Sequence, residues 1–260
     1  MKIHPKLRAA LILILWIGVW QLASMAVGSE LLLPSPTAAI GSLFHLVGET
    51  SFWQSVGMTL ARVTGGFLSG LAVGTLLGAL TARSSLADAF FSPISALIKA
   101  TPVTSFIILL LLWFSASATP TISAFLMVMP IFWSNVREGI LSTDKQLLEM
   151  AQTYKFTRWM RVKRIYAPSL LPQFIAACTT GIGFAWKSGV AAEVIASPAF
   201  SVGRGIYNSK IYLEIPDLFA WTLAVVALSM LFERLILRLI KTRLFRKTNR
   251  SPKRVRRNSV

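Results

Sequence analysis

Long hydrophobic runs, separated by short polar or charged segments, are the dominant pattern along this chain of 260 residues. A helix needs about 20 apolar residues to cross the hydrocarbon core of a bilayer, and most of these runs are that long. Only 14% of the residues are charged, whereas a soluble domain averages about 25%. We therefore predict an all-α, polytopic membrane protein. Its six predicted transmembrane helices lie at about residues 9–27, 58–82, 97–115, 120–140, 174–196 and 217–240.

The positive charges favour one orientation of these helices. Of the 27 Lys and Arg residues, three precede Ala9, seven lie between Arg137 and Arg164, and eleven follow Glu233. Cytoplasmic loops carry such an excess of Lys and Arg, so both termini and the segment after the fourth span are predicted to be cytoplasmic. The first apolar run has the basic start of a signal peptide. Its length and the spans that follow favour an uncleaved helix in the inner (plasma) membrane.

The net charge of +17 does not by itself indicate nucleic-acid binding. The basic tail, residues 247–260, has no aromatic side chain on which a base could stack. We predict that this tail is disordered in the cytoplasm and lies near anionic lipid headgroups. The polar segments 28–57 and 197–216 are predicted to be external loops.

The second span has a glycine at every fourth position. Gly66, Gly70, Gly74 and Gly78 leave one side of that helix without side chains, so that another helix can approach closely. We expect the neighbour to belong to the same bundle, with a contact between subunits as the alternative.

Three charged residues lie within or beside the predicted spans. Lys99 lies between Pro93 and Pro102, and we expect a helix break beside the second proline. Lys99 either extends to the inner interface or lines a translocation path. Lys187 and Glu193 lie in the fifth span, about 240° apart around the helix, so they do not pair directly. Because a charge within a span usually faces protein or water, each has either a path or a structural role.

A basic, amphipathic stretch follows the fourth span, from Leu147 to Gln173. It is too charged to cross a membrane and too apolar for a free linker, and an interfacial helix has this composition. Its residue order is similar to the EAA motif of binding-protein-dependent ABC permeases: Glu, two Ala, three residues, Gly, nine residues and Ile-x-Leu-Pro. The matching positions are Glu149, Ala151, Ile165 and Pro168. The differing positions are Met150, Lys155 and Ala167.

Other stretches resemble the nitrate/sulfonate/taurine branch of these permeases. They are LPSP at 33–36, TLARVTGGF at 59–67, the proline-marked third span, AWK at 185–187 and AAE at 191–193. The chain is therefore identified as a member of this family. The resemblance implies a MetI-like, type I ABC importer fold, with residues 1–246 as the transmembrane domain.

The same resemblance implies the partners and the roles of several residues. The partners are a second copy of the chain, two cytoplasmic ABC ATPase subunits and an extracytoplasmic solute-binding protein. Residues 147–168, here called the coupling loop, would dock on the ATPase, with Glu149 shaping its first short helix. The residues that would face the ATPase or lipid headgroups are Arg158, Arg161, Lys163 and Arg164. Family members transport sulfonates, nitrate, bicarbonate, taurine and thiamine-precursor pyrimidines; Lys99 and Lys187 would suit an anion.

Lys155 stands where the family has the glycine of the bend in this loop. If the bend needs a positive φ, the lysine carries a cost of about 1 kcal/mol; otherwise the bend is right-handed. The charge of Lys155 could also contribute to the choice of ATPase partner.

Several other functions are disfavoured. GIGFAWKS at 181–188 nearly matches a phosphate-binding loop, but Trp186 stands where the pattern needs glycine. ATP hydrolysis is therefore expected from a partner, and no cofactor is expected. His4 and His45 are predicted on opposite sides of the membrane, which argues against a His-based metal or catalytic site. The alternative is an ATP-independent six-helix secondary transporter or channel, although no repeat relates the two halves. An intramembrane enzyme would need a catalytic set that the spans lack.

Overall fold

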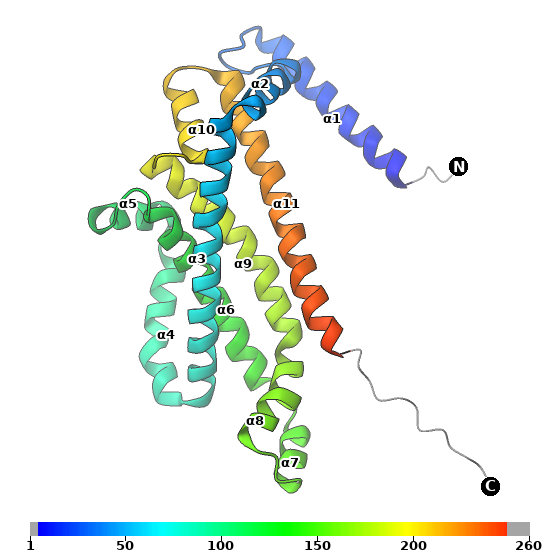
Figure 1. Cartoon of the computed structure of the whole chain (residues 1–260), viewed down its shortest axis with the longest axis vertical. Coiled ribbons are helices and arrows are strands. Elements are labelled where there is room, and N and C mark those ends of the chain that lie inside the picture. The colour runs from blue at the N-terminus through cyan, green and yellow to red at the C-terminus, as the bar shows by residue number, and fades with distance from the viewer. Residues whose placement is uncertain (1–4, 249–260) are drawn as a thin grey trace, which may run out of the picture.

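The computed structural model describes residues 5–248, and every regular element within that range is helical. The elements in chain order are α1 (Pro5–Val27), α2 (Pro36–Gly48), α3 (Thr50–Arg83), α4 (Ser85–Ala100), α5 (Val103–Trp113), α6 (Thr119–Leu141), α7 (Lys145–Thr153), α8 (Arg158–Arg161), the π-helical turn η1 (Val162–Tyr166), α9 (Ala167–Ala196), α10 (Val202–Ile211) and α11 (Ile215–Thr248). The long helices α3, α6, α9 and α11 run along the length of the molecule (Figure 1). We call the end with α7 and α8 the inner end and the end with α2 and α10 the outer end.

The core lies between α3, α6 and α9, and α6 has the most extensive contacts with the other two. Phe67, Phe132 and Ile182, one from each helix, are at most 2% exposed. The rings of Phe67 and Phe132 meet edge to face at 5.8 Å between centroids, an arrangement that adds about 1 kcal/mol to the burial of two aromatic rings. Trp186 of α9 packs on Phe232 of α11 at 5.7 Å, which attaches α11 to this core.

The glycines at every fourth position of α3 face α6 of the same chain. A Cβ added at Gly70 would lie 2.8 Å from Cβ of Val128, and one at Gly74 would lie 2.8 Å from Cβ of Phe132. Gly66 and Gly78 meet the next turns of α6 in the same way. The absence of side chains on this stripe therefore brings the two helix backbones together, and the close approach takes place within one subunit.

The two segments predicted as external loops, 28–57 and 197–216, contain the helices α2 and α10. Helix α2 begins at Pro36 with the side chain of Ser35 accepting from the N–H of Ala38 at 3.2 Å. Helix α10 begins after Ser201, whose side chain caps Arg204 in the same manner at 3.1 Å. Both helices pack at the outer end against α11. Gly205, which suggested a loop, lies in α10 directly against the ring of Trp221, where a larger residue would not fit.

The predicted third span, 97–115, is wrong as a single helix. Helix α4 ends at Ala100 and α5 begins at Val103, and the two helix axes differ in direction by 107°. The break falls at Pro102, as expected, because proline has no N–H to continue the helical ladder. Pro93, in contrast, lies inside α4 without ending it. With only 11 residues, α5 is too short to cross a bilayer alone.

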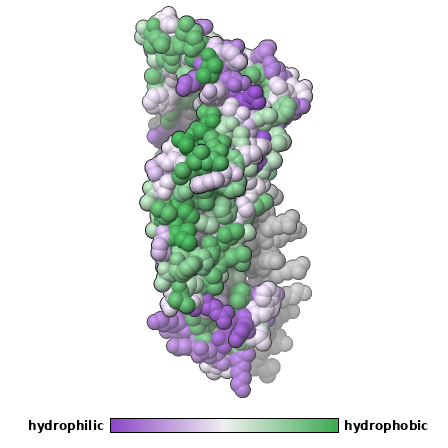
Figure 2. Space-filling model, turned by 90° about the vertical axis from the view of Figure 1, so that its left-hand side faces the viewer, coloured by the Kyte–Doolittle hydropathy of each residue, from purple (hydrophilic) through white to green (hydrophobic). Residues whose placement is uncertain are grey.

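Three helices are long and apolar enough to cross a membrane, namely α3, α6 and the part of α11 up to Arg238; a fourth span results if α4 and α5 are counted together. This count refers to the described residues, in which the apolar part of α1 is shorter, Leu11–Val27. The six-helix count therefore stays a prediction. Figure 2 shows an apolar surface along the middle of the molecule and hydrophilic residues at the inner end.

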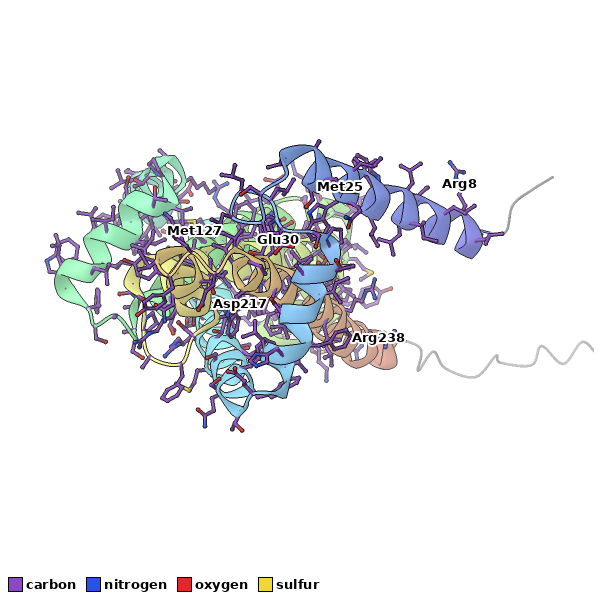
Figure 3. All side chains as sticks on the ribbon, turned by 90° about the horizontal axis from the view of Figure 1, so that it is seen from above. Arg8, Met25, Glu30, Met127, Asp217 and Arg238 are labelled. Atoms are coloured by element: carbon purple, nitrogen blue, oxygen red, sulfur yellow. The ribbon has the colours of Figure 1, made fainter. Side chains whose placement is uncertain are left out.

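Helix α1 is attached to the bundle only near its C-terminal end. Trp20 donates to the carbonyl of Pro34 at 3.0 Å, and its ring stacks on Phe219 of α11 at 5.8 Å. Seen from above, α1 extends away from the bundle, with Arg8 at its far end (Figure 3). Its residues 13–15 are 62–65% exposed. Of the predicted tail, residues 247 and 248 end α11, and 249–260 lie outside the described residues.

Substitution of glycine by alanine should change the melting temperature in opposite directions at two positions of α3. Gly74→Ala should lower the melting temperature of the purified protein, because its Cβ would collide with the α6 backbone at Met129 and overpacking costs about 1–3 kcal/mol. Gly57→Ala is the matched control: nothing lies within 4 Å of its added Cβ, and alanine favours a helix by up to about 1 kcal/mol, so this change should raise the melting temperature. Equal effects at both positions would contradict the close approach of α3 and α6.

Candidate functional site

The coupling loop forms the inner end of the molecule (Figure 1). Its first helix, α7, is capped by Asp144, whose carboxylate accepts from the N–H of Gln146 at 2.8 Å. Glu149 is exposed on α7, whereas Ala151 is completely buried. Ala151 is therefore part of the packing that holds α7, and Glu149 is available to a partner.

Helix α7 ends in a Schellman motif with a lysine at the position that usually holds glycine. The N–H of Lys155 donates to the carbonyl of Gln152 at 2.9 Å, and the N–H of Phe156 donates to the carbonyl of Ala151 at 2.8 Å. These two bonds define the motif, whose central residue is left-handed. Lys155 has a φ of 49°. Of the two geometries left open by the sequence, the bend therefore has the left-handed one, at a cost of roughly 1–2 kcal/mol for a residue with a Cβ.

The second half of the coupling loop is the start of a long helical run. Thr157 caps α8, and the run continues through η1 into α9 without a non-helical residue. The π turn ends two residues before Pro168, which has no N–H to offer the carbonyl of Arg164. At this point the N–H of Ala167 bonds five residues back, to the carbonyl of Val162. Such π turns are frequent at functional sites. The helix that contains the predicted fifth span thus begins earlier than residue 174.

Most basic residues of this run are exposed, whereas Ile165 packs against the rest of the chain. Ile165 is only 3% exposed. Arg161 is half-buried. The exposed residues are Arg158, Lys163, Arg164 and Pro168. Trp159 is 71% exposed among these charges. The loop therefore presents an aromatic ring and several cations at the inner end, where an ATPase or lipid headgroups could bind.

A second cluster, at the outer end, joins α3 to α9. Glu193 of α9 is completely buried and forms an ion pair with Arg62 of α3, with 3.1 Å between Nη1 and Oε1. The other carboxylate oxygen accepts from the hydroxyl of Thr59 at 2.7 Å and from the N–H of Gly203 at 3.3 Å. Arg62 also donates to the carbonyl of Phe200 at 3.0 Å.

This cluster holds a strained turn between α9 and α10. Ser197 and Phe200 have φ values of 47° and 48°, a conformation that non-glycine residues adopt only when the surroundings enforce it. Arg62 binds the carbonyls of Ala199 and Phe200, and Thr59 accepts from the N–H of Val202 at 3.1 Å. Of the two roles considered for Glu193, this geometry supports the structural one, because the enclosed carboxylate lines no open path here.

Arg62, which lies within TLARVTGGF, was not among the predicted site residues. An arginine inside a span and a glutamate inside another span each need a partner. That rule could have paired Arg62 with Glu193, since both lie near the outer ends of their predicted helices. A second pair that was missed, Arg137 with Asp88, lies at the inner end with 2.6 Å between Nη2 and Oδ2.

The remaining sequence-predicted residues lie apart from both clusters. Lys99, at the end of α4, is exposed and lines a cavity of about 650 Å³ between α4 and α6, and a second one of about 490 Å³ beside the α4–α5 break. Lys187 is exposed on α9 and lines neither cavity. The structure thus brings Glu193 to Arg62, and it brings neither lysine to a carboxylate.

The outer ion pair can be tested by a double-mutant cycle on thermal unfolding in detergent. Arg62→Met or Glu193→Gln alone should lower the free energy of unfolding by about 3–5 kcal/mol, because each leaves a buried group without its partner. The double change should cost clearly less than the sum of the two. The half-buried pair Arg137–Asp88 is the control, where each change should cost about 1 kcal/mol or less. Additive losses at Arg62 and Glu193 would mean that the two side chains do not interact.

The chain was then compared with known proteins. Residues 70–250 match the family described as binding-protein-dependent transport system inner membrane component. The chain is 28% identical, over 90% of its own length and 90% of the relative, to the riboflavin transport system permease protein RibX of Chloroflexus aurantiacus. It is 24% identical to the taurine transport system permease protein TauC of Escherichia coli, over 90% of its own length and 86% of the relative.

Two further comparisons extend this result. The formylaminopyrimidine transport permease protein ThiX of Halalkalibacterium halodurans is 23% identical over 84% of this chain and 86% of the relative. An inward-facing structure of the MetNI methionine ABC transporter has a chain that aligns with a TM-score of 0.51 at 19% identity, covering 72% of this chain and 93% of that one. The latter likeness confirms the all-α, MetI-like fold class.

The family match covers most of the chain, and relatives of the sulfonate and taurine branch match along nearly its whole length. The protein therefore belongs to the binding-protein-dependent transport system inner membrane components, and it is a multi-pass inner-membrane permease of the ABC importer family.

Proposed function

We propose that the chain is the transmembrane subunit of an ATP-driven importer, in which two copies of it bind two cytoplasmic ATPase subunits and receive a solute from an extracytoplasmic binding protein. The observation that carries this proposal is the coupling loop. Its charged side chains and Trp159 are exposed at the inner end, while Ala151 and Ile165 anchor it to the rest of the chain. The family membership supports the same assembly.

The helical run from Arg158 to Ala196 offers a mechanism for coupling. Its 39 residues span roughly 58 Å at the rise of an α-helix, and they connect the coupling loop to Glu193 at the outer end. Closure of the two ATPases on ATP binding would displace the loop. The displacement would reach the outer end along this one run, and the paired permease subunits would change from an inward-facing to an outward-facing state.

Pairing of two copies is supported by the surface of α1. Its exposed leucines and isoleucines continue over more than three turns on a helix that the bundle of its own chain leaves largely uncovered. Lipid can cover such a helix, and so can the bundle of a second copy. We propose the homodimer with lipid around its rim.

The solute is proposed to be a small anion, such as a sulfonate or nitrate. The names of the relatives include riboflavin, taurine and formylaminopyrimidine, so the family membership does not by itself select among them. The support for an anion is Lys99, a cation that lines both cavities.

A charge reversal on the exposed face of α7 tests the coupling assignment. Glu149→Lys should reduce ATP-dependent solute uptake at least about tenfold, equivalent to ~1.4 kcal/mol, in liposomes that contain the permease, its ATPase and its binding protein. Membrane insertion should be unchanged because Glu149 is exposed. Glu214→Lys makes the same charge change on an exposed residue at the other end and should leave coupling intact. Full uptake with Glu149→Lys would rule out this role.

The bend residue can be tested separately from its charge. Lys155→Gly should stabilise the coupling loop by about 1 kcal/mol, because glycine adopts a positive φ without the Cβ penalty. Lys155→Ala keeps the penalty and removes only the charge. If the charge helps to select the ATPase, both variants should bind the native ATPase more weakly by the same factor in a pull-down titration. If only Lys155→Gly changes ATPase binding, backbone geometry rather than charge is responsible.

A further inference from the structure

The two cavities meet at one side chain. The larger one, of about 650 Å³, is lined by polar residues of α4 and α6 and by Gln173 of α9. The smaller one, of about 490 Å³, lies beside the α4–α5 break and is lined largely by apolar side chains, among them Met127, Ile131 and Phe184. Lys99 is the residue that lines both. Each cavity is large enough for a small organic molecule.

The charges of the larger cavity are separated along its length. At the inner end, Arg137 is paired with Asp88, and the exposed Glu138 lies next to that pair in sequence. Lys99 is eleven residues farther along α4 than Asp88, which corresponds to roughly 16 Å. Among the described residues, Lys99 has no ion pair. The inner opening is therefore nearly neutral or acidic, and the far end carries one unpaired cation.

The position of Lys99 in the fold argues against a side chain that only extends to the inner interface. The α3–α4 turn at Ser84 returns the chain to the inner end, and Lys99 lies fifteen residues beyond it, beside the break. A charge at that depth faces protein or water. Here it faces two cavities.

The wall of the larger cavity is polar. Several of its residues carry hydroxyl or amide groups: Ser92, Ser95, Ser134, Asn135 and Gln173. The side-chain oxygen of Gln173 is buried without a hydrogen-bond partner among the described residues. This oxygen only accepts hydrogen bonds, so an anionic head, which has no hydrogen to donate, would contact the N–H and O–H donors of the wall instead.

We propose that Lys99 is the anion-contacting residue of a solute site at the α4–α5 break, and that the solute is an organic sulfonate or carboxylate. The negative head would bind Lys99 and the polar wall of the larger cavity, and the apolar body would occupy the smaller cavity. An inorganic anion would leave the apolar cavity unused. This inference rests on the proposed function, and it narrows the solute from anions in general to anions with an apolar body.

Charge-selective labelling tests the lysine without requiring transport. Ser95 lines the larger cavity one helical turn from Lys99, so Ser95→Cys, in a chain whose buried Cys178 is replaced by alanine, is a reporter. The rates of its reaction with ethylsulfonate and trimethylammonium methanethiosulfonates are measured in the nucleotide-free permease–ATPase complex. Lys99→Gln should lower the ratio of the anionic to the cationic rate about tenfold, because the lysine attracts the anionic reagent and repels the cationic one. Lys99→Arg should preserve the ratio.

Lys187→Gln is the matched control, because it removes the same charge from an exposed lysine outside both cavities. An unchanged ratio in Lys99→Gln, or an equal fall in Lys187→Gln, would overturn the assignment. A failure of ATP-dependent uptake would refute the proposed function and would leave this labelling result standing, so the two failures are distinguishable.

Protection of the same cysteine tests the class of solute. Hexanesulfonate should slow the labelling of Ser95→Cys, nitrate at the same concentration should slow it much less, and Lys99→Gln should abolish the protection. Equal protection by nitrate would overturn the role of the apolar cavity. Protection by hexylammonium would overturn the sign of the charge.

Discussion

The contact between the backbones of α3 and α6 is the constraint on which the rest of the fold depends. Four glycines on one side of α3 allow this approach, and the aromatic core with Phe67 and Phe132 forms around it. Helix α9 packs into the groove beside the pair, and Gly189 meets Val63 of α3 there. Because no side chain separates α3 from α6, the two helices have little freedom to slide. Relative movement has to occur at contacts that depend on side chains, such as those of α4, α5 and α11.

Helix α9 connects the two clusters that carry the candidate functions. Its inner end continues from the coupling loop, and its outer end holds Glu193 in the ion pair with Arg62. The pair also fixes the turn before α10. A displacement at the coupling loop would therefore reach a strained turn at the outer end of the molecule. An ATPase at the inner end and a solute-binding protein at the outer end would then each contact one end of the helical run that includes α9.

The sequence predicted what depends on local pattern. The positions of the long helices, the break beside Pro102 and the close approach along the glycines followed from spacing and residue type. The special place of Lys155 followed from the resemblance to the EAA motif. The helices α2 and α10 were missed because each is short and lies in a segment that the sequence pattern marked as polar. The angle between α4 and α5 could not be predicted, since a proline allows a break without fixing its direction.

Contacts between segments that are far apart in the sequence could not be predicted from the local pattern of residues either. Arg62 and Glu193 lie 131 positions apart, and no spacing rule connects them. Their pairing follows only from the need of a buried charge for a partner. The same holds for the two cavities at Lys99, which arise from the packing of α4, α6 and α9 and have no counterpart in the order of residues.

The Schellman motif at Lys155 has a consequence for the speed with which a partner binds. The bonds from Lys155 and Phe156 close on carbonyls of α7 itself, so the bend of the coupling loop has its shape before any partner arrives. A preformed surface loses little conformational entropy on binding. Association would then be governed by diffusion and by the field of the surrounding arginines and lysines, and its rate would fall as salt screens that field.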